Sequence, residues 1–288
     1  MAIKTILLPL RDSDATDAVL AAGLDAAKRL DAHVMVLHSS PDPDALIPYA
    51  TLGLSSGMRA TLREAAAKNA AQETGQLRAR TVAACERAGV AFRERGASSP
   101  ERASASWVDE TGTRSTMIAH HGRLADLIVV PRPSRMSPLP SSFEAALRDT
   151  GRPVLMVPRK GEHAVRGHHV GIAWNGSAPA AKAIVAAGPF LAGAQRISVL
   201  TTAKRRARRP SADEVVSYLA CHGLTAQVLE MDVAGASVGE AMLATASREG
   251  IDLLVAGSYS RNRMRSVVFG GVTQHLLGHA DLPVLMMY

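Results

Sequence analysis

The sequence is poor in cysteine and in aromatic residues. Of its 288 residues, two are cysteines, Cys85 and Cys221. They lie in different halves of the chain and lack the spacing of a metal site or a redox motif, so no disulfide framework is expected and a reducing compartment is favoured. Aromatic residues make up 3% of the chain, whereas hydrophobic residues make up 47%. A large core is therefore expected, and alanine, valine and leucine must fill it.

Long apolar runs are missing as well. No stretch approaches the roughly 18 apolar residues of a membrane span, so no membrane partner is predicted. Residues 1–14 are too short for a signal-peptide core and contain no small-residue cleavage site. We therefore expect a soluble protein that is located in the cytoplasm.

The sequence also lacks the motifs of efficient catalysts. It contains no Gly-x-Ser-x-Gly elbow, no Walker loop and no full Rossmann glycine fingerprint. The pairs His120-His121 and His168-His169 stand without a cysteine or a further histidine at ligand spacing, which favours surface or linker histidines over a metal site. We expect neither a bound structural metal nor an efficient enzyme.

Positive charge exceeds negative charge, and the formal net charge is +7. Such a balance permits binding to nucleotides, nucleic acid or anionic surfaces without demonstrating any of them. The densest basic run extends from Lys204 to Arg209. This run is consistent with a solvated loop and with an electrostatic attraction for phosphate or nucleic acid. Because no aromatic residue interleaves with it, a stacking platform for single strands is not expected, and nucleic acid is not predicted as a partner.

Three short segments of the sequence each have a similar counterpart later in the chain, and the counterparts follow in the same order. Residues 6–13 match 170–177, residues 125–130 match 251–256, and residues 153–157 match 283–287. The preserved order indicates a duplicated domain. The offset shrinks after the first match, so the first half holds extra residues in its middle. We predict one domain at residues 1–158 and a second at residues 168–288, joined by a polar linker.

Apolar strand patterns alternate with helical patterns in both halves. In the first half, strands are expected at 5–10, 34–38, 104–110 (or 90–94), 126–130 and 154–157, and helices after Ser13 or Asp14, at 58–88, at 113–121 and around 143–147. In the second half, strands are expected at 170–174, 196–201, 226–230, 253–256 and 284–287, and helices at 178–187, 212–222, 238–248 and 272–277. This alternation predicts an α/β fold with two repeated doubly wound domains, each a mostly parallel five-stranded sheet with helices on both faces.

The last part of the chain carries a glycine pattern. Gly257 follows a buried strand, and Gly270 and Gly271 precede a helix. Unpaired N–H groups at a helix start attract anions, and glycines let a phosphate approach the backbone closely. The loop between them contains Arg261, Arg263 and Arg265. The pattern is consistent with a phosphate cradle, and equally with a glycine that ends a strand, glycines that start a helix, and solvated arginines.

The same stretch resembles the C-terminal half of a universal stress protein domain. The ATP-binding motif of that family is glycine, two residues, glycine, nine residues, glycine, and then serine or threonine. Gly257 and Gly270 stand at the first and third of these positions, whereas Ser260 stands at the second and Gly271 at the fourth. A hydroxyl remains nearby at Thr273. The resemblance implies ATP, with Mg, as a ligand of this loop.

The resemblance also implies a fold and an assembly. The fold would be Rossmann-like, of the adenine nucleotide alpha hydrolase-like kind, and two domains of the family pair through their fifth strands. The tandem chain would then form a pseudo-dimer by itself, and two chains could still form a homodimer. The family holds its nucleotide with the loops after strands one and four, at the carboxyl edge where ligands of such sheets bind. Slow ATP hydrolysis stays open.

The two halves differ in these loops. The family commonly has an aspartate after the first strand, where this chain has Arg11 in the first half and Asn175 in the second. Arg11 cannot accept a hydrogen bond, whereas Asn175 either bonds a base or ribose or forms a turn before Gly176. Residues 131–138 of the first half contain prolines, which lack backbone donors, and no glycine. We therefore predict a degenerate first domain that does not bind ATP in the manner of the family.

The sequence thus predicts a nucleotide site in the second half. Its candidate residues are Ala173, Trp174, Asn175, Gly257, Ser258, Ser260, Gly270, Gly271, Val272 and Thr273. The protein is expected to be a stress-response regulator that binds ATP or a related adenine nucleotide there. The alternative is an interaction module for a protein partner, which keeps the fold without the ligand. The departures at Ser260, Gly271 and Asn175 favour this alternative.

Overall fold

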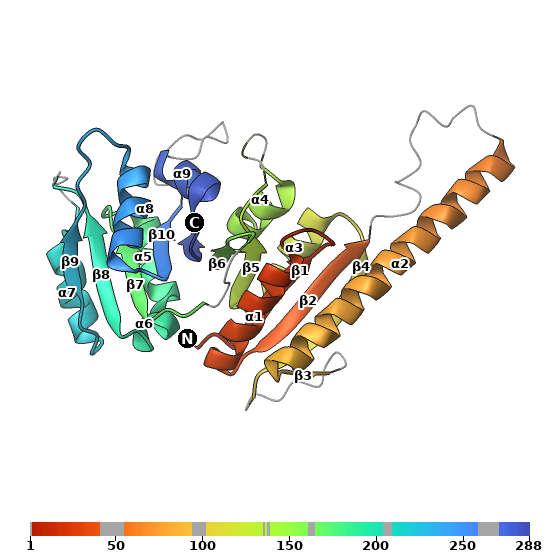
Figure 1. Ribbon diagram of the computed structural model, residues 1–288, viewed down its shortest axis with the longest axis horizontal. Coiled ribbons are helices and arrows are strands. Elements are labelled where there is room, and N and C mark those ends of the chain that lie inside the picture. The colour runs from red at the N-terminus through yellow and green to blue at the C-terminus, as the bar shows by residue number, and fades with distance from the viewer. Residues whose placement is uncertain are drawn as a thin grey trace.

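A single sheet runs through the whole molecule. The computed structural model describes residues 2–40, 55–93, 102–134, 136, 139–160, 165–203, 209–258 and 271–288. Within these residues, eleven strands form one continuous sheet, and helices cover both of its faces (Figure 1). The helices lie in two layers, so the architecture is the predicted α/β class.

Each half contributes its own series of elements. The first half contains β1 (Thr5–Leu10), α1 (Thr16–Leu30), β2 (His33–Ser40), α2 (Ser56–Ala88), β3 (Ala91–Phe92), β4 (Ser104–Thr111), α3 (Arg114–Gly122), β5 (Leu127–Pro131), α4 (Ser141–Arg148) and β6 (Val154–Val157). The second half contains β7 (His169–Ala173), α5 (Ala178–Ala186), α6 (Gly188–Ala192), β8 (Arg196–Thr201), α7 (Ala212–Cys221), β9 (Gln227–Glu230), α8 (Val238–Glu249), β10 (Leu253–Gly257), α9 (Gly271–His279) and β11 (Val284–Met287).

The strands within each half are parallel, and the halves meet in an antiparallel pair. The strand order is β3-β4-β2-β1-β5-β6-β11-β10-β7-β8-β9. β6 and β11 pair antiparallel, with Leu155 opposite Leu285. The repeated doubly wound fold and the pairing through the last strand of each half are therefore confirmed, and the chain forms a pseudo-dimer through a shared sheet.

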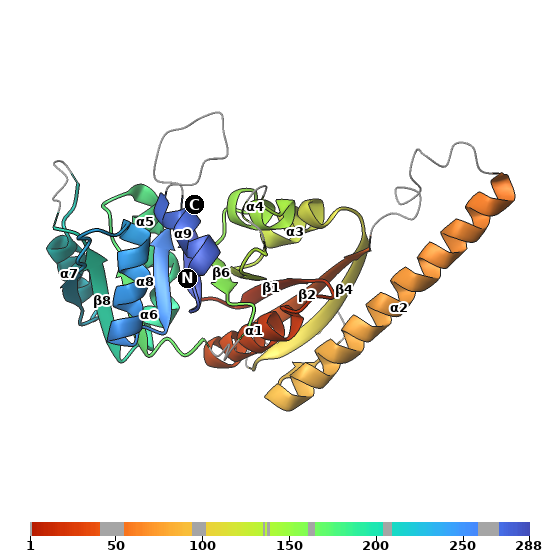
Figure 2. The same ribbon diagram turned by 45° about the horizontal axis from the view of Figure 1, so that its top comes forward.

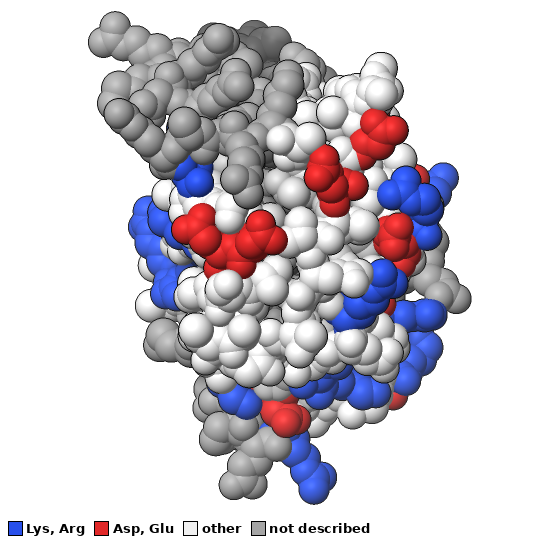
Figure 3. Space-filling model, turned by 90° about the vertical axis from the view of Figure 1, so that its left-hand side faces the viewer, with Lys and Arg blue, Asp and Glu red and all other residues white. Residues whose placement is uncertain are grey.

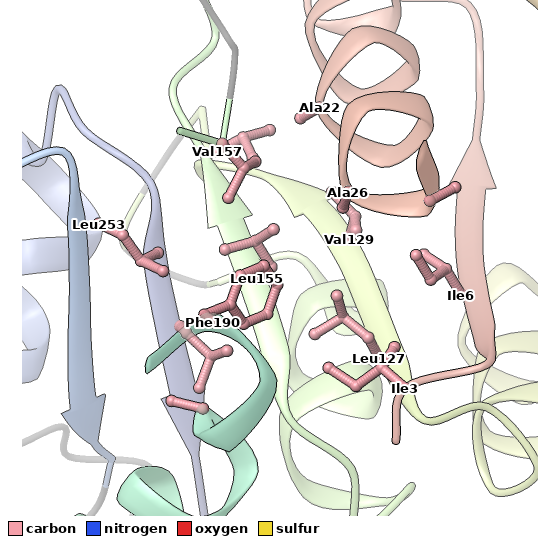
Figure 4. Close-up of a cluster of buried hydrophobic side chains, with 14 of the residues drawn as sticks. Ile3, Ile6, Ala22, Ala26, Leu127, Val129, Leu155, Val157, Phe190 and Leu253 are labelled. Atoms are coloured by element: carbon pink, nitrogen blue, oxygen red, sulfur yellow. The ribbon is translucent and has the colours of Figure 1, made fainter. Parts of the chain in front are cut away.

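The core consists of small and branched residues, as the composition requires. One cluster of buried side chains continues across the junction of the halves, from Ile6 and Val129 through Leu155 to Phe190 and Leu253 (Figure 4). Small residues bring helices close to the sheet: a Cβ on Gly23 of α1 would lie 2.5 Å from the Leu8 Cδ2 atom. Because the cluster includes side chains of both halves, the two domains share one core.

Two details of the first half differ from the sequence predictions. Both candidate segments for the third strand form strands, because β3 adds a two-residue edge beside β4. The first half therefore has six strands instead of five. The residue before α1 is Ala15, and no side chain caps this helix. The Ser13 hydroxyl accepts from the Ala15 N–H, and Asp14 pairs with Arg159, so neither residue is free to act as the predicted cap.

The extra residues of the first half include most of α2. The Ser55 side chain accepts a hydrogen bond from the Met58 N–H at the start of this helix, and Gly89 ends it with a φ of 65°. The first part of α2 projects beyond the sheet, whereas its last turns pack against it (Figures 1 and 2). Cys85 is buried at this contact, and burial raises the pKa of its thiol to about 11. Among the described helices, none is both long enough and apolar enough to cross a membrane.

Part of the predicted linker is buried against the first domain. Its Val165 is fully buried and docks on α1, where the Val165 N–H donates to Asp25 Oδ2 at 3.1 Å. Arg29 Nη1 donates to the Val165 carbonyl at 2.6 Å. These two bonds hold the connection between the halves against the first domain.

Candidate functional site

The candidate site of the second half lies where β7 and β10 end side by side. Ala173, the last residue of β7, is in register with Ala256 of β10. β10 is also paired with β11, and Gly257 stands opposite Met287. Because α9 connects β10 to the parallel β11, its first turn lies at the same carboxyl edge. The fold therefore brings the ends of two strands and the start of one helix together.

Gly257 has a structural reason to be glycine. A Cβ at this position would lie 2.4 Å from the Ala180 backbone nitrogen and 2.6 Å from the Pro179 carbonyl carbon. Contacts that short with backbone atoms require the backbone to move. The end of β10 thus approaches the first turn of α5 more closely than any side chain permits, which supports the interpretation of Gly257 as the closing residue of a strand.

Ser258 is turned toward the sheet. Its N–H donates to the Met287 carbonyl at 2.8 Å, and its hydroxyl donates to the same oxygen at 3.1 Å. The residue is completely buried. In this arrangement its hydrogen is already used within the protein, although the sequence predicted Ser258 as part of the ligand loop.

Trp174 and Asn175 form the turn after β7. The indole N–H of Trp174 donates to the Pro210 carbonyl at 2.9 Å, which directs the ring toward the neighbouring chain segment. Asn175 Oδ1 accepts from the Ser177 N–H at 3.0 Å, as in an Asx turn. Asn175 is exposed, and its amide NH₂ remains as a donor. The turn role that the sequence left open for Asn175 is therefore observed, and its bond to a base or ribose stays a prediction.

The first turn of α9 has polar groups that find no partner among the described residues. Gly271 is exposed, and a Cβ there would meet no atom within 4 Å. Thr273 is 7% exposed, and its hydroxyl has no hydrogen-bond partner among the described residues. Val272 packs against the core and orients this turn. Ser260, Gly270 and the three loop arginines at 261, 263 and 265 lie outside the described residues, so the middle of the predicted cradle stays a prediction.

The basic run lies mostly outside the described part of the chain. Of Lys204 to Arg209, the structure describes Arg209, whose Nη1 donates to the Asn175 carbonyl at 3.2 Å. On the face toward β9, the described basic side chains lie in separate groups with acidic and uncharged residues between them (Figure 3). Arg209 is thus positioned at the candidate site by a hydrogen bond to its turn.

The histidine pairs are more buried than the sequence predicted. The side chain of His121 is 7% exposed, and its Nε2 lies 3.1 Å from Glu110 Oε1. His169 is buried in β7, where its ring nitrogens contact the Glu249 carbonyl at 3.0 Å and the Ser198 hydroxyl at 2.9 Å. The prediction of surface or linker positions is therefore wrong for His121 and His169, because both pack beside strands. Within the described ranges, no group of three or more candidate metal ligands is found.

The first half has a cavity of about 90 Å³ at its own carboxyl edge. Four arginines line it, together with main-chain and small side-chain groups: Arg11, Arg114, Arg132 and Arg159. Sequence reasoning found Arg11 alone, through its place after the first strand. The other three come from α3, from the loop after β5 and from the segment after β6, and no local motif connects them.

The fold and this edge geometry define a tandem α/β protein, in which each half presents the carboxyl ends of its strands at the edge where ligands of such sheets bind. The universal stress protein family model matches residues 2–158 and 192–287, and the chain belongs to this family. The stress response protein NhaX of Bacillus subtilis is 31% identical over 58 residues, which span 20% of this chain and 35% of that protein.

One solved structure shows the same fold over nearly the whole chain. A universal stress protein from Archaeoglobus fulgidus aligns with a TM-score of 0.71 at 15% identity, over 98% of this chain and 97% of that chain. A shorter universal stress protein from Archaeoglobus fulgidus, in complex with dAMP, covers 54% of this chain and 98% of its own length, with a TM-score of 0.35 at 15% identity.

Proposed function

We propose that the protein is a stress-linked regulator of the cytoplasm that binds an adenine nucleotide at the carboxyl edge of its second half. The observation that carries the proposal is the first turn of α9. It presents an exposed Gly271 with open space beside it and a Thr273 hydroxyl without a partner in the described part of the chain. Backbone N–H groups at a helix start and a free hydroxyl are the donors that a phosphate needs.

The neighbouring turn would hold the rest of the ligand. The exposed amide NH₂ of Asn175 is a donor for an acceptor nitrogen of the base or for a ribose oxygen. Arg209 stands beside this turn and adds positive charge near the same edge. Mg would arrive with the nucleotide phosphates, since none of the described candidate residues carries a carboxylate. The residues present therefore fit a phosphate-bearing ligand by donating hydrogen bonds.

We propose binding as the function, without efficient catalysis. A hydrolytic enzyme positions a general base within hydrogen-bond reach of the attacking water. None of the described candidate residues is an aspartate, glutamate, histidine or lysine. ATP incubated with the protein should therefore be recovered intact over many binding lifetimes, as measured by the ADP formed. Rapid release of ADP would contradict this part of the proposal.

The site can be tested by calorimetric titration with ATP and Mg. Gly271→Asp places a carboxylate at the start of α9, where a side chain fits and where negative charge stabilises the helix. The variant should fold and should lose more than about tenfold in ATP affinity, because like charges in contact cost several kcal/mol. Gly57→Asp is the matched control, since it makes the same change in the first turn of α2, again in open space.

The ATP affinities of the three proteins decide whether the nucleotide site lies in the second half. One site per chain, weakened by Gly271→Asp and unchanged by Gly57→Asp, supports a nucleotide site in the second half. If Gly271→Asp binds ATP as tightly as the unmodified protein, the site is elsewhere and the proposal is wrong. If the unmodified protein releases no heat with ATP, the nucleotide proposal is equally wrong.

The alternative function is a protein-interaction module without a ligand. The observation that favours it is the projecting first part of α2 (Figure 2), where the large apolar residues Met58 and Leu62 are exposed. Deleting residues 56–72 would remove this projection and leave the buried contacts of Leu77 and Cys85 in place. The interaction proposal predicts that stress phenotypes are lost in this variant while ATP binding is retained, and the nucleotide proposal predicts that they follow Gly271→Asp.

A further inference from the structure

A second ligand site is suggested by the arginine-lined cavity of the first half, independently of the nucleotide proposal. Three helices begin at this cavity. Ala15 and Thr16 at the start of α1, Arg114 at the start of α3 and Ser142 in the first turn of α4 all line it. Helix starts carry partial positive charge and unpaired N–H groups. The fold alone therefore makes this cavity electropositive.

The guanidinium groups add full charges to the same space. Arg114 occupies the first position of α3, and burial together with the nearby Arg11 lowers the pKa of its guanidinium to about 10, against a raising effect of Glu73. Arg114 is still charged at neutral pH. A cation at a helix start, beside a second cation, is unfavourable, because helices favour anions at that end. This cost is relieved when an anion occupies the cavity.

Two of the four arginines are already neutralised. Arg159 pairs with Asp14 and also donates to the Arg132 carbonyl at 3.2 Å. Arg132 donates to the Gly278 carbonyl at 3.0 Å and lies 3.5 Å from the exposed carboxylate of Asp281. These bonds fix both guanidinium groups at the wall of the cavity and leave little net charge there.

The other two arginines form no ion pair within the described part of the chain. Neither Arg11 nor Arg114 has a side-chain hydrogen bond or ion pair with a described residue. The other carboxylates near this edge are engaged elsewhere, since Arg80 binds Asp12 of the loop after β1 at 2.5 Å and Asp17 of α1 at 3.1 Å. Glu73 lies near enough to Arg114 to offset part of its charge, so Arg11 and, in part, Arg114 bring positive charge to the cavity.

We propose that this cavity binds a small oxyanion of the phosphate class, namely inorganic phosphate or pyrophosphate. Arginine is the residue best suited to recognise such anions, because its planar donors match their oxygens in pairs. The size of the cavity selects the ligand class. Pockets for drug-sized molecules measure roughly 300–1,000 Å³, whereas this cavity measures about 90 Å³. A phosphate group fits such a space, and a whole nucleotide does not.

The missing glycine loop is consistent with this choice. Pro131 at the end of β5 and Pro133 just after it form part of the wall, and prolines offer no N–H to a phosphate. In the first half, arginine side chains therefore replace backbone N–H groups as the donors to the anion. The site would sense free phosphate while the second half binds the nucleotide.

Calorimetry with pyrophosphate and with inorganic phosphate tests the proposal, at constant ionic strength so that general screening stays fixed. The unmodified protein should bind pyrophosphate saturably at one site per chain. Arg114→Gln removes the half-buried charge and should lower the affinity by roughly tenfold to a hundredfold, the range for hydrogen bonds to charged groups. Arg11→Gln, which changes an exposed residue and leaves the fold intact, should weaken binding in the same direction.

The control is an arginine of equal charge at the opposite edge of the sheet. Arg87 is exposed in the last turn of α2, just before β3 begins, and Arg87→Gln should leave pyrophosphate binding unchanged. Retained affinity in both Arg114→Gln and Arg11→Gln would overturn the proposal, as would the absence of saturable binding to the unmodified protein. Because Gly271→Asp should still bind pyrophosphate, failure of the nucleotide proposal and failure of this one are distinguishable.

Discussion

The two carboxyl edges of the sheet have the same topology, but different groups supply their hydrogen-bond donors. In the second half, the edge is formed by a turn at Asn175, a strand end at Gly257 and a helix start at Gly271, and its donors are mostly backbone groups. In the first half, the equivalent edge is walled by prolines and arginines, and its donors are guanidinium groups. The two halves thus share the framework and differ in the loops at its carboxyl edges, which is the usual relation between fold and site.

The largest effect is expected where the two halves are joined. Leu285 of β11 is fully buried opposite Leu155 of β6, in the pair that makes the sheet continuous. Leu285→Ala should lower the free energy of unfolding by about 2–5 kcal/mol, the usual cost of a cavity at a buried leucine. Urea unfolding measures the change. Leu124→Ala, at a leucine that is 85% exposed, is the control and should change stability by less than about 0.5 kcal/mol.

This experiment also asks whether the halves are separate units. A shared core predicts one cooperative transition that moves as a whole to lower urea in Leu285→Ala. Two resolved transitions, of which the variant shifts one, would contradict the shared core and show that the domains unfold independently.

A smaller effect is expected at the strand end of the second half. Gly257→Ala adds a Cβ that would lie 2.4 Å from the Ala180 nitrogen, so the backbone must shift, at a cost of about 1–3 kcal/mol. Gly75→Ala is the opposite control, because Gly75 stands in open space inside α2 and alanine should stabilise that helix by about 0.5–1 kcal/mol. Thermal unfolding without ligand measures both.

The sign of the Gly257→Ala effect on stability tells whether Gly257 serves the fold or the ligand. Destabilisation without nucleotide shows that this glycine serves the fold first. If Gly257→Ala leaves the stability of the ligand-free protein unchanged and lowers ATP affinity alone, the close approach to α5 is not the reason for the glycine.

The smallest effect concerns one histidine in each half, the half-buried His33 and the buried His169. Burial lowers the pKa of His33, with Arg93 adding to the shift, and burial likewise lowers the pKa of His169 in β7 against hydrogen bonding by the Glu249 carbonyl. A histidine whose pKa is lower in the folded than in the unfolded state resists protonation when folded. Stability is therefore complete above the ordinary pKa, near 6.5, and is lost as pH falls below it toward the folded pKa.

Urea midpoints at pH 7.5 and pH 5 measure this loss. His169→Gln and His33→Gln should each reduce the drop in stability between the two pH values, whereas His222→Gln, at an exposed residue, should leave the drop unchanged. Equal drops in all four proteins would show that buried histidines do not determine the acid sensitivity of either half.

The sequence was sufficient for the fold because its signals are local and repeated. Apolar runs such as Leu253 to Ala256 and the duplicated strand phrases placed nearly every strand within a residue or two. The two-residue β3 was proposed as an alternative to β4, because a strand that short has no periodicity of its own. Asp14 was misassigned as a cap because its partner, Arg159, is distant in the sequence.

The site was harder to predict because its chemistry depends on distant contacts. The sequence could place Gly257 and Asn175 at the carboxyl edge, but the internal hydrogen bonds of Ser258 and Asn175 depend on β11 and on the turn geometry. The convergence of Arg11 and Arg114 arises from the topology, because α3, which follows β4, packs against β1 and β2. No spacing in the sequence predicts that these two arginines lie close together.

The central claim is that the two edges bind different ligands, and a double titration tests it most directly. ATP with Mg and pyrophosphate are titrated separately into Gly271→Asp and Arg114→Gln, and the four affinities are compared with those of the unmodified protein. The account predicts that Gly271→Asp loses ATP and keeps pyrophosphate, and that Arg114→Gln loses pyrophosphate and keeps ATP. If one variant loses both ligands while the other loses neither, a single site binds both and the account is contradicted.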